Sequence, residues 1–276
     1  MIGKLRETYP FLRSEILTNT VVGRPLPPLE IGTGPRRVIY AAAFHANEWI
    51  TAPLLLRFLG ELARAADRGG SIGNVDAADL LTRATVCAVP MVNPDGVDLV
   101  LGAATEQEAQ GAEVLAERYP RIPFPEGWKA NLMGVDLNLQ YPAGWQTARE
   151  IKFLQGYTRP GPRDYVGLAP LDQRESRALA RYTEKIDPAL VLALHSQGKE
   201  IYWRYGSTDV PGARALGERF AAASGYTLAE VPYNSGFAGD KDWFIERFRR
   251  PGYTIEVGQG RNRSINQSLY PAKPEL

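Results

Sequence analysis

The sequence predicts an α/β fold: one three-layer α/β/α domain in which helices cover both faces of a mixed, mostly parallel sheet. Short apolar runs typical of strands alternate with amphipathic runs typical of helices along the whole chain. The strand-like runs are continuously apolar, as expected of strands that are buried on both faces. With 276 residues, of which 44% are hydrophobic, the chain suits one domain of this kind.

Each element has its own signal. The first 35 residues combine a short helical pattern with a stretch rich in Gly and Pro. The strand-like runs are bounded by polar or turn-forming residues, and they are RRVIYAAAF (36–44), TVCAVPMV (85–92, ended by the turn NPDG), ALVLALH (189–195) and YTIEV (253–257). A helix that Thr51 can cap follows the first of them. Further runs with a helical period lie at 104–118, 175–186 and 211–225.

The composition excludes several classes of function. Lys and Arg number 32 against 31 Asp and Glu, so neither nucleic acid nor an anionic membrane is expected as a partner. A single cysteine, Cys87, excludes an internal disulfide. No apolar run is long enough to span a bilayer, and MIGKLRETYP has no apolar core of a signal peptide. We therefore expect a cytoplasmic protein.

The chain contains only two histidines, and both are placed at predicted strand ends. His45 follows the first strand, with Glu48 three residues later, and His195 ends the third strand. Ligands of open α/β sheets bind at the carboxyl ends of strands, so these residues can meet there. Two imidazoles and one carboxylate are a common ligand set for catalytic zinc. The alternative is a structural role for either histidine, because the spacing H-x-x-E alone is a weak signal.

Two carboxylates near other apolar runs are further candidates. In GVDLNLQYP (134–142), Asp136 and Asn138 alternate with apolar residues and would project to one side of an extended segment. Asp136 could accept the second N–H of a zinc-bound imidazole, or could be a turn or cap residue. Glu256 lies inside the apolar run YTIEV, where a carboxylate needs a salt-bridge partner or a task such as general base.

In this order, HANEW, NPDG, GVDLN, ALHSQ and TIEVG resemble the motifs of the carboxypeptidase A-like zinc metallopeptidases. The resemblance implies an α/β/α domain with a mixed sheet of eight strands and one zinc ion per chain. The family's site residues carry over onto six positions: the zinc ligands His45, Glu48 and His195, the general base Glu256, the aspartate behind a zinc ligand, Asp136, and the substrate-binding Asn138.

Several positions depart from the digestive members of that family. Leu139 stands where an arginine grips the terminal carboxylate of the substrate, and Asn47 replaces the arginine beside the zinc glutamate. Lys129 takes the place of the arginine that stabilises the oxyanion. Lys241 occupies a position that lines the specificity pocket, where its ammonium would suit an acidic group on the leaving residue; the alternative is a surface pair with a neighbouring aspartate. The mobile tyrosine matches Tyr233 best, with the spacing one residue off.

With these differences, the sequence resembles a bacterial branch of the family, the γ-D-glutamyl-meso-diaminopimelate peptidases that cut cell-wall stem peptides. HANEWIT, WKAN and GVDLNLQYP carry this likeness. It implies hydrolysis of that bond in a muropeptide or stem peptide, by one catalytic domain over residues 1–276 without a propeptide or wall-binding module.

Three other functions stay open. A general metallocarboxypeptidase is disfavoured by Leu139, and a zinc deacylase of the aspartoacylase type is disfavoured by the extended NPDG and GVDLN matches. An inactive wall-peptide binding module is disfavoured because every metal and base residue is retained.

Overall fold

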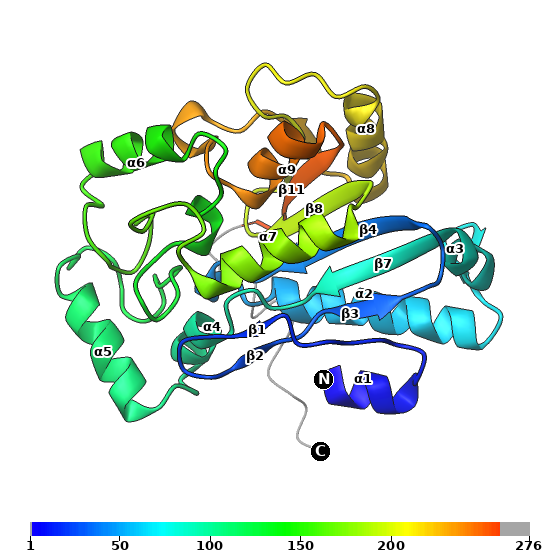
Figure 1. Cartoon of the computed structure of the whole chain (residues 1–276), viewed down its shortest axis with the longest axis horizontal. Helices are drawn as coiled ribbons and strands as arrows, with labels where there is room; N and C mark the ends of the chain where they lie inside the picture. Colours follow the sequence, from blue (N-terminus) through cyan, green and yellow to red (C-terminus); the bar gives the residue numbers. More distant parts are fainter. Residues whose placement is uncertain (1, 260–276) are drawn as a thin grey trace.

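The computed structural model describes residues 2–259 and is built around one seven-stranded sheet (Figure 1). The strand order is β10-β9-β11-β8-β4-β7-β3. These strands are Leu29–Ile31 (β3), Arg36–Ala42 (β4), Ala84–Val89 (β7), Leu190–His195 (β8), Glu200–Tyr202 (β9), Thr227–Ala229 (β10) and Gly252–Glu256 (β11). Neighbours among β7, β4, β8 and β11 are parallel, whereas β3 and β9 run antiparallel to their inner neighbours. The sheet is therefore mixed and parallel at its centre, as the sequence predicts.

The predicted number of eight strands is wrong for this sheet in the described part of the chain. Two short strands near the N-terminus, Thr18–Asn19 (β1) and Pro25–Leu26 (β2), pair with each other instead of extending the sheet. The turn between them contains Gly23 at φ 88°, which favours glycine and lets the chain fold back on itself. Ser71–Ile72 (β5) and Val75–Asp76 (β6) form a second small ribbon.

Helices cover both faces of the sheet, and the three predicted layers are confirmed (Figure 1). One face carries Ile2–Thr8 (α1), Thr51–Asp67 (α2) and Ala77–Arg83 (α3). The other carries Arg174–Ile186 (α7), Ala213–Ser224 (α8) and Asp240–Phe248 (α9).

The spacing of apolar residues explains this arrangement. Helix α2 buries Leu55, Leu59 and Leu62, three or four residues apart, against the sheet. Helix α7 buries Leu179 and Tyr182 in the same way on the opposite face. Each helix therefore turns one apolar stripe toward the strands.

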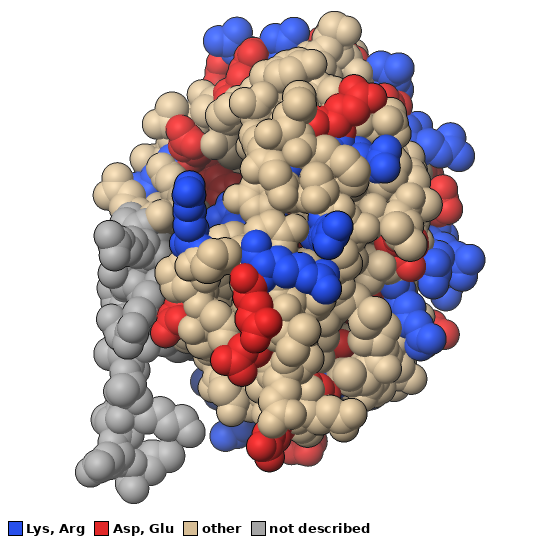
Figure 2. Space-filling model, turned by 90° about the vertical axis from the view of Figure 1, so that its left-hand side faces the viewer, with Lys and Arg blue, Asp and Glu red and all other residues tan. Residues whose placement is uncertain are grey.

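Three more helices lie at one end of the molecule, toward which β7 points in Figure 1. They are Pro94–Leu101 (α4), Glu106–Ala116 (α5) and Trp145–Leu154 (α6). Figure 2 looks onto this end and shows acidic and basic side chains interspersed over it. This distribution agrees with the near-neutral charge of the chain. None of the helices within residues 2–259 is long and apolar enough to cross a membrane.

The NPDG turn does more than end β7. Asn93 caps α4 by accepting the N–H of Gly96, and its Nδ2 donates to the carbonyl oxygens of Phe44 (3.2 Å) and Ala130 (2.9 Å). A Cβ at Gly96 would lie 2.5 Å from the Ala130 oxygen, so only glycine fits this close approach. The turn thus ties the loop after β4 to the loop that carries residue 129.

Residues 134–142 are not one extended segment, which was the condition for Asp136 and Asn138 to project to the same side. Leu137–Leu139 form a short 3₁₀ helix, and Asp136 is its N-cap, accepting the N–H of Asn138 at 3.1 Å. An Asp or Asn side chain competes with an extended backbone by making this local bond. The cap role and the support of a zinc ligand, posed as alternatives for Asp136, turn out to be compatible.

Candidate active site

The site forms where three neighbouring strands end. His45 follows β4, His195 is the last residue of β8, and Glu256 is the last residue of β11. Glu256 and His195 are paired across the parallel β11–β8 ladder. The side chains therefore meet at the carboxyl edge of the sheet, where α/β folds bind their ligands.

His45, Glu48 and His195 form one cluster, and their ligating atoms lie within 4.8 Å of one another. His45 Nδ1 lies 2.9 Å from Glu48 Oε1, and His195 Nδ1 lies 3.1 Å from Glu48 Oε2. The two Nδ1 atoms face each other at 3.3 Å. Both imidazoles thus present the same nitrogen to the same carboxylate.

This donor set fits a zinc ion. Two converging ring nitrogens and a buried carboxylate are the ligands that catalytic zinc takes, and they leave a position for water. Two ring nitrogens that face each other need a shared proton or a cation between them. Among the described residues this is the one group of three or more His, Cys, Asp or Glu side chains that could hold a metal.

The turn that carries Glu48 is fixed by Thr51, the first residue of α2. The Thr51 hydroxyl accepts the N–H of Ala43 at 2.9 Å and donates to the carbonyl of Glu48 at 2.8 Å. Ala43 adopts φ 51°, a left-handed conformation that costs roughly 1–2 kcal/mol in a residue with a Cβ. The sequence predicts Thr51 as a helix cap; in the structure it joins both ends of the metal-binding turn.

Asp136 lies behind His45, as predicted. Its Oδ1 is 3.1 Å from His45 Nε2, and its Oδ2 accepts the N–H of Asp164 at 3.3 Å. A carboxylate in this position fixes the tautomer of the imidazole and leaves Nδ1 for the metal. His195 is held differently, because its ring stacks on Phe44 with the centroids 5.2 Å apart.

Charges in the site shift several pKa values. Burial alone would raise the pKa of Glu48, but His45 and Lys129 hold it well below the usual range. Lys129 Nζ lies 3.0 Å from Glu48 Oε1. Burial, together with the charge of Glu48, raises the pKa of Glu256 to about 8. Glu256 therefore has the affinity for a proton that a general base needs.

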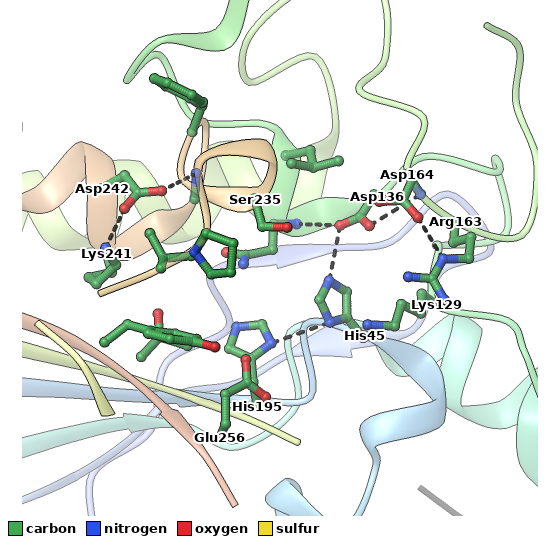
Figure 3. A pocket seen from close by; sticks show the side chains of 18 of the residues that line it. His45, Lys129, Asp136, Arg163, Asp164, His195, Ser235, Lys241, Asp242 and Glu256 are labelled. Carbon is green, nitrogen blue, oxygen red and sulfur yellow. Dashed lines mark hydrogen bonds and ion pairs between the residues drawn. The ribbon is translucent and has the colours of Figure 1, made fainter. Parts of the chain in front are cut away.

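A pocket opens beside this cluster, and Figure 3 shows its lining. Asn138 and Leu139 are among the residues that line it, and Figure 3 shows Lys129 close to His45. Asn138 Oδ1 accepts the N–H of Asp240 at 3.1 Å, so its amide is held in place. Its Nδ2 has no hydrogen-bond partner within residues 2–259, which leaves this group for a substrate.

Lys241 also lines the pocket, and only 4% of it is exposed. Its Nζ donates to the carbonyl of Arg204 at 2.7 Å and forms an ion pair with Asp242. The alternative of pairing with a neighbouring aspartate is thus realised, but inside the pocket instead of on the surface.

Two of the predicted substrate-binding residues are not in the pocket lining. Tyr233 is 70% exposed and packs edge-on against Phe237, with the ring centroids 5.1 Å apart. Asn47 donates from Nδ2 to the carbonyl of Glu126 at 3.3 Å. Their roles toward a substrate stay predictions.

Sequence reasoning missed three charged residues of the pocket: Lys152, Arg163 and Asp164. Lys152 is on α6, and its Nζ lies 2.8 Å from Asp164 Oδ1. Arg163 Nε lies 2.5 Å from Asp164 Oδ2. The segment RPGPRDYVG shows no periodicity, and its Pro and Gly predict only a turn, so nothing there marked a site.

Comparison with known proteins places this geometry in a family. The model of the zinc carboxypeptidase family, peptidase M14, matches residues 1–274. A Lysinibacillus sphaericus protein named gamma-D-glutamyl-L-diamino acid endopeptidase 1 is 42% identical over 261 residues, which cover 95% of this chain and 64% of the relative. The uncharacterized protein YqgT of Bacillus subtilis is 36% identical over 95% of this chain and 69% of its own length. This chain thus spans about two thirds of these curated relatives.

Solved structures agree on the fold. Carboxypeptidase A from Helicoverpa armigera superposes with a TM-score of 0.71 at 19% identity, covering 94% of this chain and 64% of that structure. Murein-tripeptide amidase MpaA from Escherichia coli O157 superposes with a TM-score of 0.53 at 19% identity, covering 93% and 87%. The zinc family and the His-Glu-His cluster together confirm the predicted zinc cofactor. The chain belongs to the zinc carboxypeptidase family.

Proposed function

We propose that this chain is a zinc-dependent peptidase that hydrolyses the bond between γ-D-glutamate and meso-diaminopimelate in peptidoglycan stem peptides. The name of the 42% identical relative points to this specificity. The observation that carries the proposal is the pocket wall, which contains the apolar Leu139 and the buried Lys241. A leucine cannot make the paired bonds with which an arginine grips a terminal carboxylate. Other basic side chains of the pocket, such as Lys241, must therefore bind the acidic groups of the substrate.

The proposed chemistry is amide hydrolysis. His45, Glu48 and His195 would hold the zinc ion, which would supply Lewis acidity and make water easier to deprotonate at neutral pH. Glu256 accepts the proton of the attacking water and delivers it to the leaving amine. Its raised pKa of about 8 suits a group that must hold this proton between the two steps.

Lys129 and Asn138 act on the substrate around this centre. The Lys129 ammonium, 3.0 Å from Glu48 Oε1, offsets negative charge that develops on the carbonyl oxygen. The amide of Asn138, held by Asp240, donates to the substrate and fixes its orientation.

Lys241 receives the acidic group of the leaving residue. One ammonium hydrogen is used by the Arg204 carbonyl and one by Asp242, which leaves a third for the side-chain carboxylate of diaminopimelate. Because Asp242 already neutralises much of this charge, the attraction is weaker than that of an unpaired ammonium.

The test is incubation of the zinc-loaded protein with L-Ala-γ-D-Glu-meso-diaminopimelate, with the products identified by mass spectrometry. Release of free diaminopimelate and L-Ala-D-Glu is expected, and Glu256→Gln protein is the negative control. Parallel incubations with α-linked peptides that have free C-termini and with N-acyl amino acids test the carboxypeptidase and deacylase alternatives. Cleavage of either set in preference to the stem peptide would refute the proposal.

A further inference from the structure

The metal cluster lies between two groups of cations in the pocket. Figure 3 shows Lys241 and Asp242 on one side of the histidines, and Lys129 and Arg163 on the other. Burial opposes ionisation of Lys129, but the charge of Glu48 raises its pKa overall, and the nearby positive charge of Arg163 offsets part of this rise, which agrees with the two cations lying on the same side. A substrate that crosses the metal centre therefore meets a basic side chain in both directions, paired with Asp242 on the side of Lys241.

The side chain of Arg163 is held in place by an ion pair with Asp164. Its Nε is bound to Asp164 Oδ2 at 2.5 Å, and the other oxygen of Asp164 is bound to Lys152 at 2.8 Å. The Asp164 N–H donates in turn to Asp136, which lies behind His45. The guanidinium is thereby held in a fixed position relative to the zinc ligands.

The terminal nitrogens of the Arg163 guanidinium are also free to bind a ligand within the described part of the chain. Its side chain is 38% exposed, and within residues 2–259 its two terminal nitrogens have no hydrogen-bond partner. Asp164 faces two cations, Arg163 and Lys152, so this group carries an excess of positive charge toward the pocket. A planar guanidinium with two free donors matches a carboxylate.

We infer that Arg163 binds the free α-carboxylate of the D-glutamate on the acyl side of the scissile bond. This inference rests on the proposed function. In a γ-glutamyl bond the side-chain carboxyl forms the amide, so the α-carboxylate of the same residue stays ionised. An α-linked peptide has no anion in this place. Arg163 is thus a specificity residue that recognises the γ-linkage itself, while Lys241 recognises the leaving residue.

The test compares two stem peptides that differ in one group: one with the D-glutamate α-carboxylate, the other with its uncharged α-carboxamide. Wild-type protein is expected to favour the acid in kcat/KM by on the order of 10–100-fold. Arg163→Gln is expected to abolish this preference by slowing only the acid. Because both substrates are measured on one preparation, a loss of folded protein lowers both kcat/KM values alike and cancels in their ratio, which is the quantity compared.

Two further variants sharpen the result. Arg163→Lys retains the charge without the paired donors and should keep part of the preference. Arg121→Gln, an exposed arginine outside the pocket lining, should keep all of it. The inference is overturned if wild type treats acid and amide alike, or if Arg163→Gln slows both equally. If wild type cleaves neither peptide, the proposed function fails first and this subsite fails with it.

Discussion

Replacing Asp136 by asparagine tests whether the residue behind His45 tunes the metal site. Asp136 accepts three N–H groups, from His45 (3.1 Å), Asn138 (3.1 Å) and Asp164 (3.3 Å). An asparagine keeps the shape but turns one oxygen into a donor, so one of these N–H groups must face another donor. The bond to the imidazole also loses its charge. Loss of a hydrogen bond to a charged group costs about 1.5–3 kcal/mol, which predicts zinc affinity lowered by roughly 10–100-fold.

The assay is a zinc titration against a competing chelator, followed by kcat/KM at saturating zinc. Asp67→Asn, at an exposed position on α2, is the matched control and should bind zinc as wild type does. Partial recovery of turnover at high zinc is expected, because the ligands themselves remain. The reasoning is refuted if Asp136→Asn protein takes up zinc as tightly as wild type and turns over at the same rate.

Three other changes have defined outcomes. Glu256→Gln should retain one zinc by metal analysis yet lose roughly 10²–10⁴-fold in kcat, and an active variant would point to another base. For Glu175, burial first and the charge of Asp95 next raise the pKa to about 6 from 4.5, so its ionisation opposes folding increasingly as pH rises through this range. Glu175→Gln should therefore raise the free energy of unfolding by about 2 kcal/mol at pH 7 and by little at pH 4; an equal gain in urea titrations at both pH values would contradict this. Replacing Lys241 by methionine and Asp242 by asparagine together removes the buried pair without leaving one charge alone. This double variant should cut the kcat/KM preference for diaminopimelate over lysine by about tenfold, and an unchanged preference would exclude Lys241 as the selector.

The metal-binding part of the site could be predicted because its residues follow readable elements. His45, His195 and Glu256 each come directly at or after an apolar run, and the carboxyl ends of parallel strands meet at one edge. The hydrophobic pattern placed residues up to 211 positions apart, from 45 to 256, at the same edge of the sheet, and the resemblance to the zinc metallopeptidases supplied their roles.

The rest of the pocket depends on how irregular segments pack. Lys152 is turned inward by α6, and Arg163 and Asp164 lie in a loop whose path is set by its contacts with Asp136. The sequence left the conformation at Asp136 open, since alternation of polar and apolar residues fits both an extended segment and a capped 3₁₀ turn. The number of eight strands was implied by the family resemblance and not by the hydrophobic pattern, and the sheet within residues 2–259 has seven.

The site is assembled from two kinds of backbone, and this has a consequence for how such enzymes diversify. The zinc ligands and Glu256 are placed by strand ends and by the turn that Thr51 fixes. Leu139, Arg163 and Lys241 line the pocket away from the metal cluster, and they come from segments that form no strand of the sheet. The residues that carry out hydrolysis and the residues that select the substrate are therefore held by different parts of the backbone. Joint exchange of segments 139–173 and 231–242 between relatives should transfer substrate choice, because it leaves the zinc ligands, Lys129, Asp136 and Glu256 in place.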